Sequence, residues 1–342
     1  MKTSIALASL STTALVLAGC ASAGEDEMVI DDAVVTDPAP VEPDTTVFAT
    51  TTILGAVLDE IVTCVGDDTV AVDVLMPIGA DPHDFAPSSE QIALMAGAGI
   101  IVANGLGLEG GLDDTLDQLE ADGVTVLHVA EWIDPLPFAE MATDDHDHGH
   151  DDEHSEEEAE GDEHAHGEFD PHFWLDMARM ADVAKNMGVE LEPLLGAEVL
   201  TCADEVAEGI LETEQQVIDT LSVIADDRRL LVTDHEAFSY FAARYDFEIA
   251  GVVIPGGSTL AEPSSQELAA LVATIEELSV PALMGNIHEQ SDLLTAVAAE
   301  SGDLSVVSLY VGSVGGPDSE AADYPSMMLT NAQLIADALS AG

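Results

Sequence analysis

Positively charged residues are almost absent from this chain of 342 residues. It has 6 Lys+Arg against 68 Asp+Glu, which gives a formal net charge of -62. A nucleic-acid partner would need a basic patch to neutralise its phosphates, so we exclude nucleic acid. The scarcity of Lys is also typical of salt-adapted proteins, in which dense surface carboxylates keep the chain soluble when salt screens their repulsion. A halophilic origin is therefore a hypothesis that the sequence leaves open.

Long apolar runs are missing as well, apart from one near the N-terminus. Residues 5–17 are largely apolar, but a membrane-spanning helix needs about 20 such residues. We interpret residues 1–19 as a secretory signal peptide. It ends in Leu17-Ala18-Gly19-Cys20, which is similar to a bacterial lipobox and would make Cys20 the lipidated residue. The alternative is an ordinary signal peptide that a cysteine follows by chance.

The segment after Cys20 has no periodic pattern. Residues 20–46 are rich in Ala, Asp, Glu, Pro and Val and predict a flexible acidic tether. We therefore expect an exported monomer, lipid-anchored at the outer face of the cytoplasmic membrane or in the periplasm. It would touch the membrane only through its lipid.

Cysteine is scarce too, because Cys64 and Cys202 are the only ones besides Cys20. In an oxidising, exported setting these two could pair, and the long loop that they close would stabilise the fold by several kcal/mol in the chain-entropy model. Two unpaired buried thiols are the alternative, since the sequence does not give their separation.

One low-complexity run, residues 144–167, combines acidic residues with histidine. The histidines of the run are His146, His148, His150, His154, His164 and His166. Because the run has almost no apolar residues, it cannot offset its ordering entropy, and we predict a mobile loop. Imidazoles in an acidic field also predict a collector of divalent metal ions. The alternative is a solvated charge run with incidental histidines.

Strand-like and helix-like segments alternate from residue 47 onward. Strands are predicted at 47–51, 70–76, 100–103, 124–129, 230–233, 248–254, 282–284 and 305–309. Helices are predicted at 53–65, 91–98, 175–190, 197–225, 236–245, 264–278, 291–301 and 326–340. This alternation predicts an α/β fold of two lobes, each with a parallel-type sheet flanked by helices, joined by one long rigid helix. The predicted N-terminal lobe is 47–196, including the loop 144–167; the linker helix is 197–225 and the C-terminal lobe 226–342.

Three further histidines lie in loops or at the ends of predicted elements. His83 stands in a loop framed by prolines, His172 in a turn between a proline and two aromatic residues, and His235 directly after a strand. Loops at the carboxyl ends of parallel strands are where ligands normally bind. Three neutral imidazoles suit a borderline cation such as Zn²⁺ better than Mg²⁺ or Ca²⁺, which prefer oxygen. We therefore predict a metal site.

Four segments give the chain a family resemblance. They read GADPHDFAPS at 79–88, DPHFWLD at 170–176, TDHEAFSY at 233–240 and YPSMM at 324–328, the last followed by Asn331. From about residue 46 to the C-terminus, the chain resembles the solute-binding lipoproteins of zinc and manganese ABC transporters. The His-rich loop 144–167 comes just before the second of the three histidines, His172, which is also its place in the zinc-type members of that family.

The resemblance implies a function and a ligand set. His83, His172 and His235 would bind the metal, and a membrane permease of the ABC transporter would be the partner. Zinc-type members have His at the third position, where manganese-type members tend to have Glu. The resemblance thus implies Zn(II), with Mn(II) as the alternative, and a binding subunit instead of an enzyme.

The fourth ligand is where the chain departs from the resemblance. The family usually places an Asp or Glu after the strand at 282–284, and here Asn286 takes that place, with His288 and Glu289 close behind. An amide oxygen is a weak zinc ligand. We therefore favour His288, Glu289 or a water as the fourth ligand over Asn286.

Two other functions fit parts of the pattern. Zinc hydrolases also use three protein ligands and an open fourth position, and Glu236 or Glu289 could act as the general base, although the sequence has no HExxH motif. An adhesin or surface metal buffer, with the His-rich loop as its working part, is the other alternative.

Overall fold

The computed structural model describes residues 43–138, 169–256, 259–289 and 291–340. All of these residues belong to one compact unit, residues 41–342. The predicted signal peptide, Cys20 and the His-rich loop 144–167 lie outside the described residues. Most of the predicted tether also lies outside them, although its last two residues belong to the first strand.

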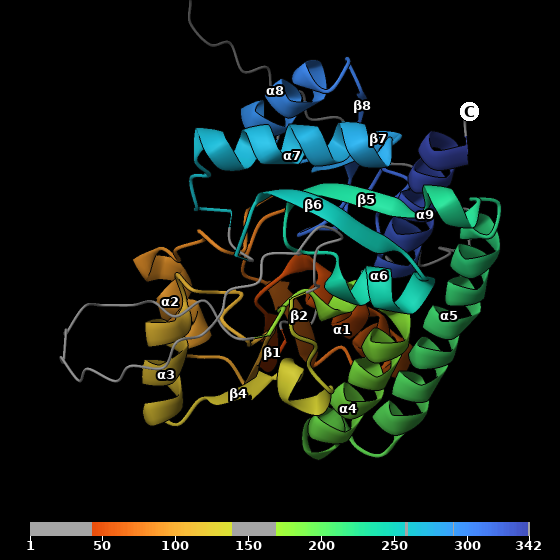
Figure 1. The fold of residues 1–342 in the computed structure, drawn as a ribbon. Helices are drawn as coiled ribbons and strands as arrows, with labels where there is room; N and C mark the ends of the chain where they lie inside the picture. The colour runs from red at the N-terminus through yellow and green to blue at the C-terminus, as the bar shows by residue number, and fades with distance from the viewer. Residues whose placement is uncertain (1–42, 139–168, 257–258, 290, 341–342) are drawn as a thin grey trace, which may run out of the picture. The chain divides into compact units, whose positions relative to one another are not determined.

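Two parallel sheets of four strands form the framework of the described residues (Figure 1). The first has the order β2-β1-β3-β4, with β1 at Thr45–Ala49, β2 at Val70–Val74, β3 at Ile100–Ala103 and β4 at Thr125–His128. The second has the order β6-β5-β7-β8, with β5 at Leu230–His235, β6 at Glu248–Ile254, β7 at Ala282–Asn286 and β8 at Ser305–Leu309. Every pairing is parallel. The predicted α/β fold with two sheets is therefore confirmed.

Helices follow the strands in both halves. They are α1 (Thr52–Val65), α2 (Ser89–Met95), α3 (Asp113–Ala121), α4 (Met177–Leu195), α5 (Glu198–Leu221), α6 (Ser239–Tyr245), α7 (Ser265–Leu278), α8 (Asp292–Glu300) and α9 (Tyr324–Ser340). Helix α3 was not predicted. Within the described ranges, none of the helices combines the length and apolarity that crossing a membrane would require.

Local capping signals set several helix starts. Ser88 and Gln91 form a reciprocal capping box at α2, and Ser264 does the same with Glu267 at α7. Helix α6 begins at Ser239, three residues later than predicted. The residues between β5 and α6 therefore form a loop, which leaves His235 at the end of its strand.

The long helix α5 packs against helices from both halves of the chain. It lies along α4 and also contacts α1 and α9, and Figure 1 shows it running beside both sheets. Gly188 of α4 permits the close approach, since a Cβ there would stand 2.4 Å from the Cβ of Ala203. A disulfide joins Cys64 of α1 to Cys202 of α5. The lobe boundaries themselves stay a prediction.

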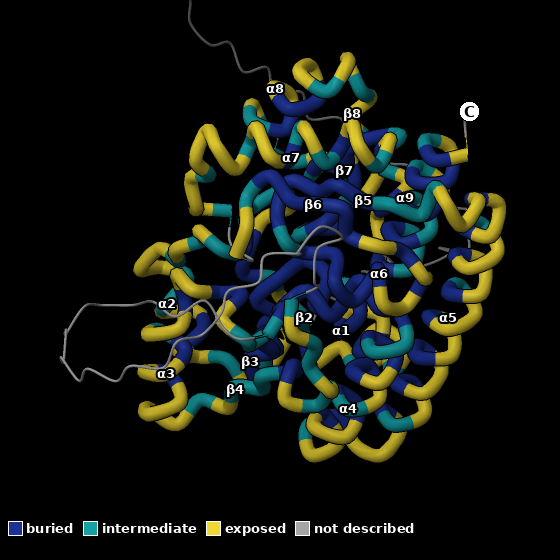
Figure 2. Tube along the Cα trace, in the orientation of Figure 1, coloured by how far each residue is buried: buried dark blue, intermediate teal, exposed yellow. Residues whose placement is uncertain are grey.

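Buried residues concentrate in the strands and on the inner faces of the helices (Figure 2). One buried apolar cluster contains Val47 of β1, Leu231 of β5 and Tyr324 of α9. The two halves therefore share a core, and large aromatic side chains such as Trp174 fill it. A shared core of this kind holds the loops between the sheets in fixed positions.

Candidate metal site

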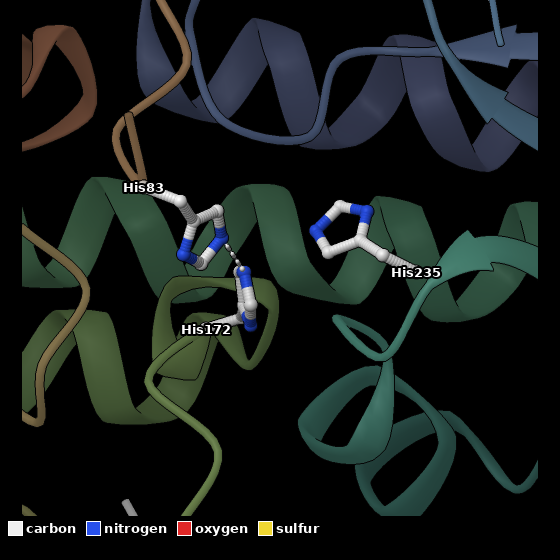
Figure 3. Close-up of side chains that lie close together, drawn as sticks. All are labelled: His83, His172 and His235. Carbon is white, nitrogen blue, oxygen red and sulfur yellow. Dashed lines mark hydrogen bonds between the residues drawn. The ribbon is translucent and has the colours of Figure 1, made fainter. Parts of the chain in front are cut away.

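The three predicted histidines converge from separate elements, as Figure 3 shows. His83 lies in the loop after β2, His172 just before a short 3-10 turn, and His235 at the end of β5. Their ligand-capable nitrogen atoms all lie within 4.8 Å of one another. His83 and His172 are closest, with 3.2 Å between their Nε2 atoms.

This spacing is close to that of a tetrahedral zinc site. Zinc–nitrogen bonds of about 2.0–2.1 Å place two ligand nitrogens ~3.3 Å apart. The pair His83 and His172 already has 3.2 Å. The widest spacing in the group is at most 4.8 Å, so a shift of about 1.5 Å would complete the geometry.

An aspartate orients the imidazole of His172. Asp170 Oδ1 lies 2.7 Å from Nδ1 of this ring and also accepts the His172 backbone N–H at 2.9 Å. Both residues are buried. Burial lowers the pKa of His172 below its usual value, although the charge of Asp170 opposes this shift. The shift favours the neutral ring, and in the tautomer whose Nδ1–H donates to Asp170, the lone pair of Nε2 faces the site.

The turn that follows His172 is fixed by the C-terminal half. The indole Nε1–H of Trp174 donates to the backbone oxygen of Val311 at 2.8 Å, and the Tyr324 hydroxyl donates to the backbone oxygen of Trp174 at 2.6 Å. These hydrogen bonds are buried. His172 is thus held across the two halves before any ion arrives.

His235 is oriented in the same way by its neighbour. Asp234 Oδ1 lies 2.9 Å from Nδ1 of the ring, and Asp234 Oδ2 accepts the backbone N–H of Asn286 at 2.8 Å. Burial acts to lower the pKa of His235, but the hydrogen bond and charge of Asp234 outweigh it, and the pKa is raised. The same pairing lowers the pKa of Asp234 against the effect of its burial. His235 therefore holds a proton more tightly than a free imidazole does.

These aspartates were not predicted as site residues, although the sequence carries a signal for them. Each histidine follows an aspartate by one or two residues, and the three are Asp81, Asp170 and Asp234. The backbone N–H of His83 donates to Asp81 Oδ1 at 2.9 Å, which matches the contact of Asp170 with its histidine. The repeated Asp-Pro-His sequence is thus a local turn that presents an imidazole.

The candidates for the fourth ligand lie around this group. Asn286 faces the same small cavity, but its Oδ1 accepts the backbone N–H of His288 at 3.1 Å. The ring of His288 packs beside Tyr310 and against the backbone of Gly79, and burial lowers its pKa. Within the part of the chain that the structure describes, the close group contains the three histidines without His288 or Glu289.

Glu289 stands at the edge of the site. The pKa of Glu289 is raised to about 7, first by burial and then by the negative charge of the nearby Asp81. The rest of the lining of the small cavity includes Val311 and Gly312, which have no side-chain ligand atom. As metal ligands, Asn286, His288 and Glu289 stay predictions.

The arrangement of two parallel sheets is shared with periplasmic metal-binding proteins. The solved structure of the zinc-binding protein TroA from Treponema pallidum has a TM-score of 0.70 and 23% identity, and the match covers 87% of this chain and 100% of that one. A manganese-bound periplasmic protein from Candidatus Liberibacter asiaticus has a TM-score of 0.67 and 19% identity, with 86% and 99% covered. These likenesses define the fold class.

Residues 47–338 match the family described as zinc-uptake complex component A, periplasmic, and the chain belongs to this family. Membership confirms the resemblance predicted from the sequence. The family is a substrate-binding component of metal transporters, so the expectation that the chain is not an enzyme is also confirmed.

Relatives in the family carry names for two metals. The manganese-binding lipoprotein MntA of Halalkalibacterium halodurans is 26% identical over 292 residues, which cover 84% of this chain and 86% of MntA. TroA of Treponema pallidum, a zinc-binding protein, is 26% identical over 302 residues, covering 84% and 88%. The zinc-binding lipoprotein AdcA of Streptococcus pneumoniae is 26% identical over 275 residues, and the match spans only 52% of its length.

Proposed function

We propose that this protein is the extracytoplasmic zinc-binding subunit of a metal-uptake ABC transporter. It captures Zn(II) with His83, His172 and His235 and delivers the ion to a membrane permease. The observation that carries the proposal is the convergence of three imidazoles within 4.8 Å, two of them bonded through Nδ1 to buried aspartates. No chemical step is required, because the ion only exchanges water for imidazole nitrogen.

The donor set favours zinc over manganese. Imidazole nitrogen suits Zn²⁺, whereas Mn²⁺ prefers carboxylate, carbonyl and water oxygen. The three close ligand atoms are all nitrogen. We therefore propose Zn(II) as the cargo and Mn(II) as the alternative. A water completes the site, or else Glu289 or His288 after a movement of its loop, with Asn286 the weakest candidate.

The segments outside the described residues complete the proposal. Cys20 carries the lipid anchor after removal of residues 1–19, and the tether that follows, which ends where β1 begins at Thr45, connects a monomeric body to the outer face of the membrane. The loop 144–167 gathers zinc from solution for the site. A surface metal buffer would use this loop in place of the three-histidine site.

Deletion of residues 144–167 separates these two functions. In the deletion variant, one zinc should still bind tightly, and His235→Ala should weaken that binding at least 100-fold, as the loss of one of three ligands. His128→Ala is the matched control. His128 is not one of the three clustered histidines, and its Nε2 lies 3.4 Å from Glu120 Oε1. Isothermal titration with Zn(II) and then with Mn(II) gives the affinities. Loss of nearly all zinc binding on deletion of the loop would favour the buffer.

A further inference from the structure

A second, larger cavity adjoins the three-histidine group. Its volume is about 180 Å³, and its lining residues are Asp234, His235, Ile254, Thr259, Glu289 and Ser291. The small cavity that the three imidazoles face has about 10 Å³. His235 and Thr259 line both. The two spaces therefore adjoin each other at these residues.

The volumes decide what each cavity holds. A single water needs about 10–15 Å³ of such space. The small cavity therefore holds at most one water, whereas the larger one, at about 180 Å³, has room for several. A hydrated dication fits only the larger cavity, and it must lose water before it reaches the imidazoles.

Glu289 links the larger cavity to the loop that carries His83. After burial, the charge of the nearby Asp81 is the largest influence that raises the pKa of Glu289, and Asp81 Oδ1 accepts the His83 backbone N–H at 2.9 Å. The hydroxyl of Thr259 donates to the other oxygen of Asp81. Glu289 is thus the carboxylate in this cavity that is not held by a neighbouring histidine, and it is half-buried, within reach of solvent.

We infer that the larger cavity is the route of the cargo ion and that Glu289 is the side chain that binds the hydrated ion first, before the three imidazoles take it. A carboxylate oxygen attracts a hydrated dication, whereas imidazole nitrogen is the better ligand once water has left. The transfer is ligand exchange alone. This inference rests on the proposed function, and it gives Glu289 a role in uptake that differs from that of a fourth ligand.

Rates of zinc binding test the inference. Trp174 is a built-in reporter, because its ring centroid lies 5.2 Å from that of His172, and we expect its fluorescence to change when an ion binds there. In stopped-flow mixing of the full chain with Zn(II), Glu289→Gln should lower the association rate constant about fivefold or more. The dissociation rate constant, measured with excess chelator, should fall by the same factor, because a side chain that contacts the ion only on its route leaves the equilibrium affinity unchanged. The visible absorption of the Co(II)-loaded site should also match that of the unsubstituted chain.

Glu60→Gln is the matched control. Glu60 is more exposed than Glu289, but its pKa is likewise raised first by burial, and it lines a different cavity, between α1 and α5. This variant removes the same charge and should leave both rate constants unchanged. An equal fall in the association rate for both variants would show a general charge effect and overturn the inference.

Two other outcomes would overturn it as well. If Glu289→Gln raises the dissociation rate constant and alters the Co(II) spectrum, Glu289 is a ligand of the bound ion. If neither rate changes, the ion takes another route. In both cases the proposed function survives, whereas it fails separately if the unsubstituted chain gives no Trp174 signal and no Co(II) spectrum with metal.

Discussion

Replacing Asp234 by Asn should weaken zinc binding in a way that depends on pH. Asp234 is 5% exposed, its Oδ1 lies 2.9 Å from Nδ1 of His235, and its Oδ2 accepts the Asn286 backbone N–H at 2.8 Å. In Asp234→Asn, the side-chain N–H₂ takes the place of Oδ2 and faces the backbone N–H of Asn286, so that two donors oppose each other. An unsatisfied buried group costs about 1–3 kcal/mol of unfolding free energy. Loss of the aspartate behind a metal-binding histidine typically costs 10–100-fold in affinity, or about 1.4–2.7 kcal/mol.

The pKa of His235 sets the pH dependence. Because Asp234 raises this pKa, zinc must displace a proton from His235 at low pH. The substitution lowers the pKa and so removes part of that competition. The loss of affinity should therefore be largest near pH 8 and smaller near pH 6. In the ion-free protein, the raised pKa of His235 affects the stability of the fold, and this effect has the opposite pH dependence. It stabilises the folded state below the unfolded pKa, and the contribution is lost as pH rises through the folded pKa.

Asp170→Asn is the comparison that isolates the effect. Burial lowers the pKa of His172, whereas that of His235 is raised, so a proton competes with zinc less at His172 and the loss of affinity should vary less with pH. The assay is zinc competition against a chelator of known affinity at pH 6 and pH 8. An equal pH profile for the two variants would refute the reasoning, as would an Asp234→Asn variant that binds zinc normally.

Three further predictions concern pH and stability. Zinc affinity of the unsubstituted chain should fall between pH 7.5 and 5.5, because protonated imidazole cannot bind metal; equal affinities by calorimetry would count against histidine ligation. Reduction of the disulfide, whose cysteines are 138 residues apart, should lower the free energy of unfolding by about 2–5 kcal/mol. Urea titration with and without reductant measures this change, and an unchanged unfolding midpoint would contradict it. Arg244→Met should lower the free energy of unfolding by about 2–3 kcal/mol, because it leaves the buried carboxylate of Glu214 without the guanidinium that now donates to it at 2.6 and 2.9 Å. In thermal melts, the double variant Arg244→Met, Glu214→Gln should recover part of this stability.

The fold could be predicted from the sequence wherever hydrophobic patterning was strong. Buried parallel strands read as short apolar runs, and β3, for example, was predicted with its observed bounds, Ile100–Ala103. Helix α3 was missed because only Leu116 and Leu119 of its residues are buried, and two apolar positions do not make a recognisable period. The start of α6 was placed too early because the loop after His235 has no turn residue to mark it.

The site could be predicted only in part. Positions at the carboxyl ends of strands indicated His83 and His235, because parallel strands bring such loops to one edge. The proximity of Glu289 to Asp81 brings together loops of different sheets, so it depends on how the halves pack, and no local pattern reports it. The place of His288 against Gly79 has the same origin.

A crystal structure of the protein grown with Zn(II), with anomalous scattering measured on both sides of the zinc absorption edge, tests the central claim most directly. The account predicts one strong anomalous peak about 2.0–2.1 Å from a ring nitrogen of each of His83, His172 and His235. A fully loaded crystal whose zinc peaks all lie elsewhere, with the three imidazoles unliganded, would contradict it.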